Sequence, residues 1–458
     1  MTKPLTVAVI DIGKTNAKVV LFDFAKAKEI WTRKLANTPV KDGPYPHHDV
    51  EKLWAFILES LKAAGADHEI DAISITTHGA TGVLLDDKYE LALPALDYEF
   101  TGLNVAEYDK VRPGFDETGS PRLPGGLNLG AQYYWLQGAF PKEFAKARWI
   151  VMYPQYFAYR LSGVLAGEVT SLGCHTDLWA PEKEDYSSMV DKLGWRKMMP
   201  PIRKAADELG HITKDVAKAT GLPLTTPVMC GIHDSNASLY PHLFSQHLPF
   251  SVVSTGTWVI NMAMGGEKVE LDAARDTLIN VNALGHAVPT SRFMGGREFQ
   301  MLMEGHEASV TTSENAERVL ENGAMLLPSV VESCGPFPSR KAQWINAEKA
   351  TAGEKRAIVS YYLALMTSVC LDLIGAQGPV LVEGPFASNA QFVAMLSAAT
   401  GRDVLLGEAE ATGTSLGAAL LATPEPVKQA PSQRVNTSAD SLLSGYASQW
   451  KKLIAQKS

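Results

Sequence analysis

Asp234 is the residue best suited to act as a general base in this chain. It closes residues 227–234 (PVMCGIHD), a short apolar stretch that predicts a strand ending in polar side chains. A carboxylate within hydrogen-bond reach of a hydroxyl group can take up its proton as the oxygen attacks an electrophile. Asp234 is therefore a candidate catalytic base; the alternative is a solvated or capping aspartate in the loop. The neighbouring His233 is a rival base, although a histidine beside a strand end is more often structural.

A polar turn near the N-terminus joins two apolar stretches. Residues 5–10 (LTVAVI) and 17–23 (AKVVLFD) predict two strands, and residues 11–16 (DIGKTN) form the turn between them. The GKT run inside this turn is not a P-loop. That motif needs glycine where this chain has Ala8, and it must open a helix, whereas a strand is predicted to follow.

The same turn has the groups that a phosphate-binding hairpin needs. Thr15 and Asn16 supply hydrogen-bond donors, and Lys14 or Lys18 supplies positive charge. Asp11, at the strand end, is a candidate ligand for Mg²⁺ through water, because this ion prefers oxygen ligands and keeps several waters. The alternative is an ordinary β-hairpin with a polar turn.

A second unit of the same design begins at residue 250. Residues 250–260 (FSVVSTGTWVI) predict an apolar strand, a turn of small polar residues, and another apolar strand. Two such units in one chain suggest a duplicated α/β domain with a phosphate-cradling hairpin in each half. We place the boundary near residue 245 and expect two domains, residues 1–245 and 246–458.

Other segments surround these turns. A helix is predicted over residues 48–64, with Asp49 as its N-cap. A strand at residues 72–76 leads to His78, and a loop follows with Asp97 and Glu99, whose carboxylates could accept hydrogen bonds from a ligand; alternatively, Asp97 caps a turn. Helices are also expected over residues 353–374, 389–400 and 439–456. The segment 113–129 is rich in proline and glycine, which is typical of an exposed loop or lid.

Composition limits the class of protein. The 458 residues suggest two or three domains, and 46% hydrophobic with 20% charged residues is the balance of an ordinary globular protein. A net charge of −8 argues against nucleic acid as the main partner. The four cysteines lack a C-x-x-C pair, which favours reduced thiols over a zinc site. No run of about 18 apolar residues is evident, so we expect no membrane span and a cytoplasmic protein.

Six segments, in this order, resemble the motifs of the FGGY carbohydrate kinase family, which belongs to the actin/hexokinase/heat-shock ATPase superfamily. The resemblance covers nearly the whole chain. The segments are residues 11–18 (DIGKTNAK, first phosphate motif), 78–81 (HGAT, sugar-side loop), 231–234 (GIHD, catalytic strand end), 254–258 (STGTW, second phosphate motif), 293–296 (FMGG) followed by Gln300, and 383–389 (EGPFASN, adenosine motif).

The resemblance implies a fold of two ribonuclease-H-like, actin-like α/β domains with an interdomain cleft. It implies sugar bound mainly to the first domain, at His78 and Asp234, and ATP with Mg²⁺ as cofactors. It also allows a homodimer. The ATP contacts that it implies, beyond Asn16 and Lys18 of the first turn, are Thr15, Thr255, Gly256, Gly296, Gln300, Gly384 and Ser388.

Departures from the family pattern leave the sugar open. Many members have an arginine in a W-x-D-x-R-like segment, whereas residues 94–100 read PALDYEF. Glycerol kinases have an Arg-Glu pair where this chain has Gly79 and Ala80. We expect a kinase for a ketopentose or deoxyketohexose of the xylulose, ribulose, fuculose or rhamnulose type. The alternatives are a superfamily ATPase or a sugar-binding regulator without kinase activity.

Overall fold

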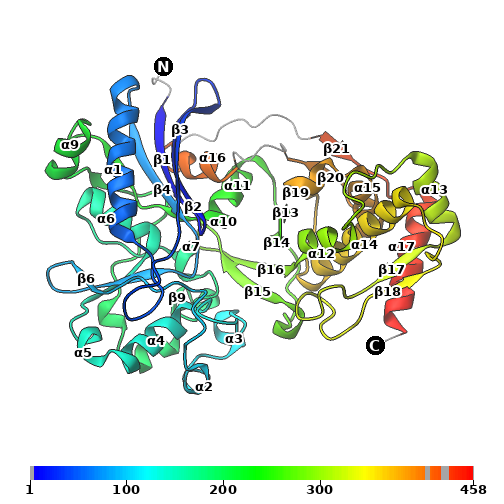
Figure 1. The fold of residues 1–458 in the computed structure, drawn as a ribbon, viewed down its shortest axis with the longest axis horizontal. Helices are drawn as coiled ribbons and strands as arrows, with labels where there is room; N and C mark the ends of the chain where they lie inside the picture. The colour runs from blue at the N-terminus through cyan, green and yellow to red at the C-terminus, as the bar shows by residue number, and fades with distance from the viewer. Residues whose placement is uncertain (1–4, 408–412, 424–432, 457–458) are drawn as a thin grey trace. The chain divides into compact units, whose positions relative to one another are not determined.

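The computed structural model describes residues 5–407, 413–423 and 433–456, and the chain divides into two compact units (Figure 1). Unit 1 contains residues up to 245, together with 279–287 and 413–423; unit 2 contains the rest of the described residues. The first division coincides with the boundary expected from the sequence. The two later segments of unit 1 interrupt the segment 246–458, and the two-domain assignment itself stays a prediction.

The central sheet of unit 1 has the order β10-β11-β4-β1-β2-β3, and β12 pairs with β4 beyond this path. Strand β1 is antiparallel to β2 and parallel to β4. A strand follows the GKT run, so the rejection of a P-loop is confirmed. The strands are β1 (Thr6–Ile12), β2 (Asn16–Asp23), β3 (Lys28–Ala36), β4 (Ala72–Thr77), β10 (Glu208–His211), β11 (Pro227–Met229) and β12 (Ile232–His233).

Alternation along β1 gives this sheet two apolar faces. Ala8 and Ile10 belong to a core shared with α1 (Val50–Asp67) and α6 (Tyr153–Ser162). Val7 and Val9 belong to a second core that includes residues of α10 (Asp234–Leu239) and α16 (Gly413–Leu420). Figure 1 shows α1 on one side of the strands and α10 and α16 on the other. As predicted, Asp49 caps α1: its side chain accepts a hydrogen bond from the backbone nitrogen of Lys52 at 3.0 Å.

Helices α10 and α16 pack with their backbones in close approach. A β-carbon at Gly417 would lie 1.7 Å from the carbonyl oxygen of Ala237, so only glycine fits this position of α16. The hydroxyl group of Ser74, in β4, donates to the carbonyl oxygen of Ala418 at 2.6 Å. Helix α16, which comes late in the chain, therefore packs on the same face of the sheet as α10.

Unit 2 repeats the design of unit 1. Its sheet has the order β15-β16-β14-β13-β19-β20-β21, in which β13 is antiparallel to β14 and parallel to β19. The predicted strand–turn–strand unit at residues 250–260 is therefore confirmed. The strands are β13 (Phe250–Thr255), β14 (Val259–Met264), β15 (Thr277–Val281), β16 (Ala287–Phe293), β19 (Val380–Glu383), β20 (Val404–Leu406) and β21 (Gln433–Val435).

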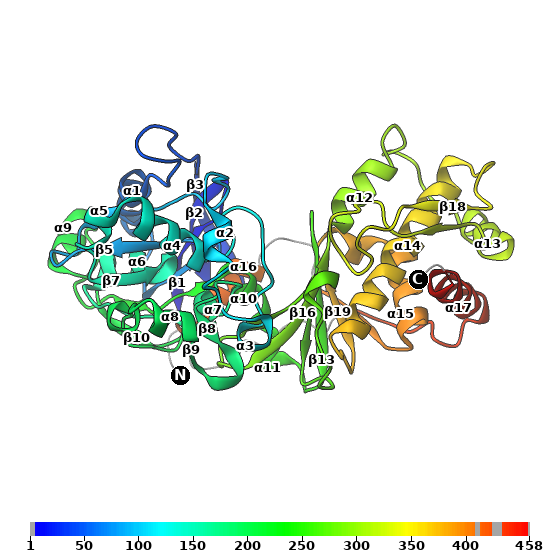
Figure 2. The ribbon, with the colours of Figure 1, turned by 90° about the horizontal axis from the view of Figure 1, so that it is seen from below.

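Three of the helices of unit 2 lie together on one side of this sheet (Figure 2). They are α14 (Ala352–Leu373), α15 (Ala390–Thr400) and α17 (Ser441–Ala455), close to the predicted bounds. Helix α14 is long and apolar enough to cross a membrane, contrary to the expectation that no such run exists. Because 78% of its apolar window is buried inside the protein, core packing accounts for its composition.

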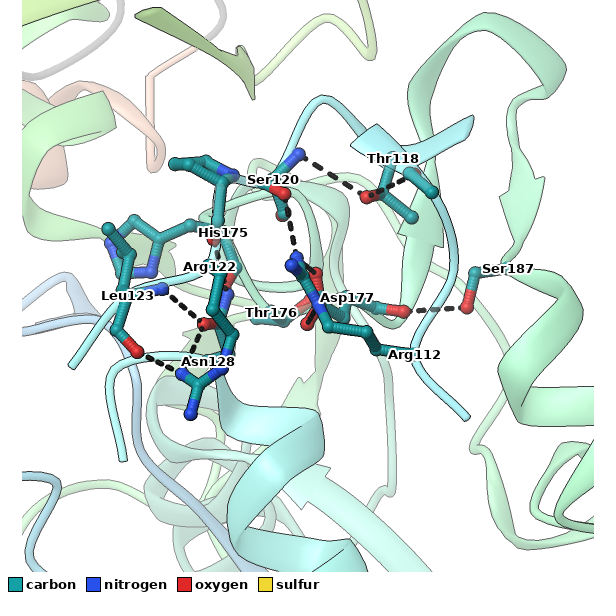
Figure 3. A network of polar contacts seen from close by, with 12 residues as sticks. Arg112, Thr118, Ser120, Arg122, Leu123, Asn128, His175, Thr176, Asp177 and Ser187 are labelled. Atoms are coloured by element: carbon teal, nitrogen blue, oxygen red, sulfur yellow. Dashed lines mark hydrogen bonds and ion pairs between the residues drawn. The ribbon is translucent and has the colours of Figure 1, made fainter. Parts of the chain in front are cut away.

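The segment 113–129 is not the exposed loop that its prolines and glycines predicted. Thr118, Ser120 and Asn128 are at most 3% exposed. The side chain of Asn128 accepts a hydrogen bond from Leu123 and donates to the carbonyl oxygens of Pro121 and His175 (Figure 3). Side chains thus satisfy backbone groups that an exposed loop would leave to water.

A buried ion pair holds the same region from the other side (Figure 3). The guanidinium group of Arg112 donates to both carboxylate oxygens of Asp177, at 2.9 and 3.1 Å, and to the carbonyl oxygen of Ser120. Burial raises the pKa of Asp177, and the hydrogen bonds and charge of Arg112 oppose this rise. The segment is fixed by this pair, which argues against a mobile lid here.

The remaining elements complete the two units. They are β5 (Gly82–Leu85), β6 (Leu91–Leu93), β7 (Trp149–Met152), α2 (Val105–Tyr108), α3 (Phe115–Thr118), α4 (Leu129–Ala139), α5 (Pro141–Phe144), α7 (Val169–Leu172), β8 (Trp179–Ala180), β9 (Asp185–Tyr186), α8 (Ser188–Lys192), α9 (Lys214–Thr220), α11 (His242–Ser245), α12 (Gly295–Leu302), α13 (Ser313–Asn322), β17 (Met325–Leu327) and β18 (Gln343–Ile345).

Candidate active site

Three parallel strands of unit 1 end at the same edge of its sheet. Ile12 of β1 is paired with Thr77 of β4, and Thr77 is paired with His233 of β12. The residues that follow β4 and β12 are His78 and Asp234. Ligands of open α/β sheets bind at the carboxyl ends of the strands. The fold therefore brings the predicted base and the predicted sugar-binding histidine to the edge where a substrate would lie.

Asp234 begins α10, and its side chain remains 34% exposed. Its Oδ1 accepts a hydrogen bond from the backbone nitrogen of Ser235 at 2.6 Å and lies 3.2 Å from Nε2 of His233. Loss of hydration raises the pKa of Asp234, and the hydrogen bonds from the backbone and the hydroxyl group of Ser235 oppose the rise. A carboxylate with a raised pKa that still reaches solvent is suited to accept a proton.

Burial lowers the pKa of His233 to about 4, so this imidazole is neutral at pH 7. Its Nε2 also lies 3.6 Å from the sulfur of Cys174, and its Nδ1 lies 3.5 Å from the side-chain nitrogen of Asn236. The contact of Nε2 with Asp234 favours the tautomer in which Nε2 donates. His233 therefore serves better as a support for Asp234 than as the base.

Asp11 lies near the same edge and has a strongly perturbed carboxylate. Burial raises its pKa to about 6, and the charges of Asp234 and Glu29 act in the same direction. Lys18 opposes this rise: its ammonium group lies 3.3 Å from Oδ2 of Asp11 and donates to the hydroxyl group of Ser415 at 3.0 Å. The site thus holds more negative than positive charge, which favours an added cation.

Lys14 is directed toward the predicted sugar-binding carboxylates. Its ammonium group contacts Oδ1 of Asp97, lies 3.6 Å from Oε2 of Glu99, and lies 4.6 Å from the centre of the Tyr98 ring. Donor and acceptor groups side by side match the hydroxyl groups of a sugar, which both donate and accept. From the sequence, either Lys14 or Lys18 could supply positive charge to a phosphate group. In the structure, the ammonium group of Lys14 contacts Asp97 instead.

His78 packs in a buried group of rings that the sequence did not indicate. The ring centres of His78, His48 and Tyr153 lie 5.2 to 5.6 Å from one another. Within the described residues, both ring nitrogens of His48, Nε2 of His78 and the hydroxyl group of Tyr153 have no hydrogen-bond partner. Burial lowers the pKa of His48 to about 2 and also lowers that of His78, so both imidazoles are neutral.

Nδ1 of His78 lies 2.9 Å from the carbonyl oxygen of Gly79, to which it donates, so Nε2 is left as an acceptor. The backbone nitrogen of His78 donates to the carbonyl oxygen of Ile12 at 2.9 Å, which ties this loop to the first turn. The imidazole is only 6% exposed. His78 is therefore placed beside the site with a fixed tautomer.

The first turn exposes its predicted phosphate donors. Thr15 and Asn16 are exposed, and the side-chain amide of Asn16 donates to the hydroxyl group of Thr15 at 3.1 Å. Gly13 donates its backbone hydrogen to the carbonyl oxygen of Asn16, and the side chain of Asn37 donates to the carbonyl oxygen of Gly13. These hydrogen bonds fix the conformation of the turn, while the side chains of Thr15 and Asn16 stay exposed.

In unit 2, several predicted ATP contacts come together through close backbone approaches. A β-carbon at Gly384 would lie 2.1 Å from the carbonyl oxygen of Thr255, and one at Gly296 would lie 2.0 Å from that of Gly256. The second turn, the start of α12 and the end of β19 therefore meet. Thr255 acts as the link: its hydroxyl group donates to the carbonyl oxygen of Glu383 and accepts from the backbone nitrogen of Phe386.

The other two predicted ATP contacts of unit 2 are exposed. Gln300 lies in α12, four residues after Gly296, and Ser388 follows β19, where its hydroxyl group donates to the carbonyl oxygen of Pro385 at 2.9 Å. The hydroxyl group of Thr255 is already used by Glu383 and Phe386. In this unit, backbone groups and exposed side chains are therefore better placed than Thr255 to bind a nucleotide.

Three further polar or aromatic residues of unit 1 lie in its interior. Gln155, Tyr156 and Trp179 are at most 6% exposed. The side-chain amide of Gln155 donates to the carbonyl oxygens of Cys230 and Gly231, at 3.2 and 3.1 Å. Gln155 therefore supports the segment that leads to Asp234, and Tyr156 and Trp179 pack in hydrophobic cores.

Comparison with known families gives two matches that together cover most of the chain. One is described as the FGGY family of carbohydrate kinases, N-terminal domain, and matches residues 6–98 and 125–240. The other is described as carbohydrate kinase FGGY, C-terminal domain, and matches residues 247–431.

Individual relatives agree with these matches. An L-fuculokinase of Salmonella typhi is 23% identical over 271 residues, which are 57% of each chain. The chain thus spans a little over half the length of the first curated relatives that it matches. An L-xylulose/3-keto-L-gulonate kinase of Escherichia coli is 25% identical, with 67% of this chain and 61% of that enzyme covered.

Solved structures extend the comparison to the whole chain. A carbohydrate kinase from Novosphingobium aromaticivorans superimposes with a TM-score of 0.92 and 35% identity, and the match covers all of both chains. A xylulose kinase from Brucella ovis has a TM-score of 0.81 over 98% of both chains, and at 16% identity it supports the fold alone.

Proposed function

This chain belongs to the FGGY family of carbohydrate kinases, and we propose that it transfers the γ-phosphoryl group of ATP to a hydroxyl group of a sugar. One observation carries the proposal: Asp234, with a raised pKa and 34% exposure, directly follows β12, just as His78 directly follows β4, at the edge shared by three parallel strands. This placement supplies a base and a polar surface for an alcohol in one unit.

The proposed sugar is a ketopentose or deoxyketohexose of the xylulose, ribulose, fuculose or rhamnulose type. Relatives named as L-fuculokinase and as L-xylulose/3-keto-L-gulonate kinase support this range. Asp97 and Glu99 would accept hydrogen bonds from sugar hydroxyl groups, and Lys14 between them would donate. His78 would orient the sugar from the side of Asp234.

In the proposed reaction, a hydroxyl oxygen of the sugar attacks the γ-phosphorus of ATP, and the bond from that phosphorus to the β,γ-bridging oxygen breaks. Asp234 takes the hydroxyl proton, so ADP leaves and a sugar phosphate forms. Phosphoryl transfer depends on positioning and charge neutralisation more than on covalent chemistry. Thr15, Asn16 and Lys18 in unit 1 are the proposed phosphate contacts.

The proposed ATP contacts of unit 2 are Thr255, Gly256, Gly296, Gln300, Gly384 and Ser388. For Gly296 and Gly384, the support is steric: the backbone of each lies so close to the second turn that a β-carbon would clash with it. For Thr255, it is the position at the end of β13, next to the exposed Gly256. The interdomain cleft that the family fold implies stays a prediction.

Mg²⁺ fits the residues around Asp11. The described residues contain no group of three or more histidine, cysteine or acidic side chains that could hold a metal by themselves. Mg²⁺ in kinases is typically bound by one or two carboxylates, water and substrate phosphates, so one carboxylate suffices. Asp11, raised in pKa by burial and by Asp234, would hold the ion. When bound, Mg²⁺ would neutralise charge on the phosphate oxygens.

We further propose that the enzyme works in the cytoplasm on small molecules, with neither nucleic acid nor membrane as partner, and that a homodimer is its assembly. The free cysteines motivate the cytoplasmic location, and the negative net charge argues against nucleic acid as a partner. A superfamily ATPase or a sugar-binding regulator is disfavoured because neither needs a base at the position of Asp234.

A screen of ATP turnover tests the proposal. Purified protein would be assayed with Mg²⁺-ATP against ketoses, aldoses and polyols, and the phosphorylated product would be identified by mass spectrometry. We expect turnover that depends on one group of ketoses. ATP hydrolysis that no sugar accelerates would point to the ATPase alternative, and sugar binding without turnover would point to the regulator.

A further inference from the structure

The segment that carries Asp234 is weakly held by its own backbone. Strand β12 contains only two residues, and within the part of the chain that the structure describes it pairs with β4 alone. The residue before it, Gly231, has a φ of +90°, and a β-carbon there would lie 2.8 Å from the carbonyl oxygen of Ile75. A short strand with an irregular entry needs side chains to fix its position.

One side chain binds this segment directly before the base. The backbone nitrogen of His233 donates a hydrogen bond of 3.0 Å to the hydroxyl oxygen of Thr170, which lies in α7 and is fully buried. On the opposite edge, β12 is paired with β4. The hydroxyl group of Thr170 therefore supplies the acceptor that a further strand would otherwise provide.

A buried carboxylate fixes the orientation of that hydroxyl group. The hydroxyl group of Thr170 donates to Oε2 of Glu168 at 2.5 Å, and Oε1 of Glu168 accepts from the backbone nitrogen of Thr170 at 2.9 Å. Since the single hydroxyl proton is used by Glu168, the lone pairs of the oxygen face His233. A hydroxyl group that donates to a carboxylate is also a stronger acceptor, because hydrogen bonds in a chain polarise one another.

The role of Glu168 as a helix cap does not by itself require a glutamate. It is fully buried, and no cation contributes to its pKa, which burial raises to about 7 while the hydrogen bonds of Thr170 and Ser171 oppose the rise. As the N-cap of a helix of only four residues, it could be replaced by serine, threonine or aspartate. Its length is needed for a different purpose: its second oxygen reaches the hydroxyl group of Thr170.

We propose that Thr170, oriented by Glu168, is a positioning residue for the proposed sugar kinase reaction: its hydroxyl group fixes the backbone at His233 and thereby the place of the Asp234 carboxylate. Gln155 fixes the same segment two and three residues earlier, at Cys230 and Gly231. None of these side chains needs to touch the substrate. The inference rests on the proposed function, because it assigns Asp234 as the base.

Two substitutions of Thr170 separate the effect of its hydroxyl group from the effect of its side-chain volume. Thr170→Val keeps the volume and removes the hydroxyl group, whereas Thr170→Ser keeps the hydroxyl group and removes a methyl group. A misplaced catalytic group lowers the rate roughly 10- to 100-fold. We expect this loss in kcat for Thr170→Val, with the KM values for sugar and ATP changed less than about threefold, and near wild-type kcat for Thr170→Ser. Glu168→Gln should lie between them.

A matched control is Thr367→Val in unit 2, where an equally buried hydroxyl group donates to the carbonyl oxygen of Leu363 at 2.8 Å. It should lower Tm without lowering kcat. Equal loss of kcat in Thr170→Val and Thr170→Ser would assign the effect to packing and overturn the proposal, as would unchanged kcat in Thr170→Val. If Thr170→Val does not fold, Glu168→Gln decides in its place: an unchanged kcat there overturns the proposal.

Hydrogen exchange gives a readout that does not depend on activity. In peptides covering residues 231–235, the amide of His233 should exchange faster in Thr170→Val than in wild type and Thr170→Ser. Unchanged exchange would remove the link between Thr170 and His233. A wild-type protein that phosphorylates no sugar would instead refute the proposed function, and the exchange result would still decide this link.

Discussion

The backbone of Gly384 lies against Thr255 so closely that a β-carbon at residue 384 would stand 2.1 Å from the Thr255 carbonyl oxygen. The φ of Gly384 is +78°, a conformation that side chains rarely adopt. Both features serve one purpose, since they bring the end of β19 to the second turn. The two proposed ATP contacts are thus one steric unit, and a change at either should affect both.

Gly384→Ala should therefore reduce both stability and nucleotide affinity. Gly401 offers a matched control, because its φ is +68° and a β-carbon there would meet no atom within 4 Å. Gly401→Ala should cost about 1 kcal/mol of unfolding free energy from backbone strain alone. Gly384→Ala should cost about 2 kcal/mol more and raise the KM for ATP. Equal effects of the two substitutions, measured by chemical denaturation and kinetics, would contradict this steric role.

Asp234→Asn should lower kcat by about 10²- to 10⁴-fold, the usual contribution of a general base. The amide keeps the shape of the side chain, so KM for the sugar should change little. The exposed Asp215 in α9 is the control, and Asp215→Asn should leave kcat unchanged. Steady-state kinetics with detection of ADP would check both variants. Normal turnover in Asp234→Asn would remove the residue from the mechanism.

The rate should fall in mild acid. The pKa of Asp234 is raised, and that of Asp11 is raised to about 6. Both carboxylates act in their charged form, one as the base and the other as the proposed Mg²⁺ ligand, so protonation of either removes activity. We expect kcat/KM to decline as the pH falls below about 6. A profile that stays flat to pH 5, measured by direct product analysis, would show that neither carboxylate needs its charge.

Asp11→Asn should stabilise the protein while lowering its activity. The folded-state pKa of Asp11 lies above the ordinary value of 3.8, so the folded state binds the proton more tightly than the unfolded state does. The charged carboxylate thus opposes folding increasingly as the pH rises from about 4 to about 6, and fully above that. Without Mg²⁺, Asp11→Asn should raise the unfolding free energy at pH 7.5 by up to about 3 kcal/mol; the raised pKa from which this follows already includes the opposing effect of Lys18.

This gain should shrink toward pH 4, where Asp11 is protonated in the wild-type folded state as well. Urea unfolding at pH 7.5 and pH 4.5 would measure the difference. A loss of stability at pH 7.5 would mean that the ion pair with Lys18 outweighs the cost of burying the carboxylate.

His78→Ala should raise the KM for the sugar roughly tenfold or more, through loss of an oriented hydrogen-bonding group of about 1.5 kcal/mol. The KM for ATP should stay nearly constant, because His78 lies beside the proposed sugar contacts. His211, a half-exposed histidine of the same unit, is the control, and His211→Ala should change neither constant. An equal rise of both KM values in His78→Ala would assign it to general support of the fold.

Local patterns in the sequence were sufficient for the turns and the main elements. The strands on both sides of residues 11–16 and 254–257, the Asp49 cap and helix α14 all follow from composition over a few neighbours. His48, Tyr153 and Thr170 could not be found in this way. Each is an ordinary residue of its own segment, and only long-range pairing brings it to His78 or His233.

The prediction of an exposed loop over residues 113–129 was wrong for a related reason. Proline and glycine mark irregular backbone, which is usually exposed because buried polar groups need partners. Here Asn128 and Arg112 supply those partners from within the protein. No local pattern shows that an asparagine will be satisfied by the backbone of Pro121 and His175.

Helix α16 gives the protein an order of assembly. It helps to cover the face of the first sheet that carries Val7 and Val9, yet it begins only at residue 413. During synthesis, α10 can cover part of that apolar face early, but the part that α16 covers stays bare until most of the chain has been translated. A nascent chain of this protein should therefore depend on chaperones for longer than its early strands would suggest, and a truncated product ending near residue 400 should aggregate.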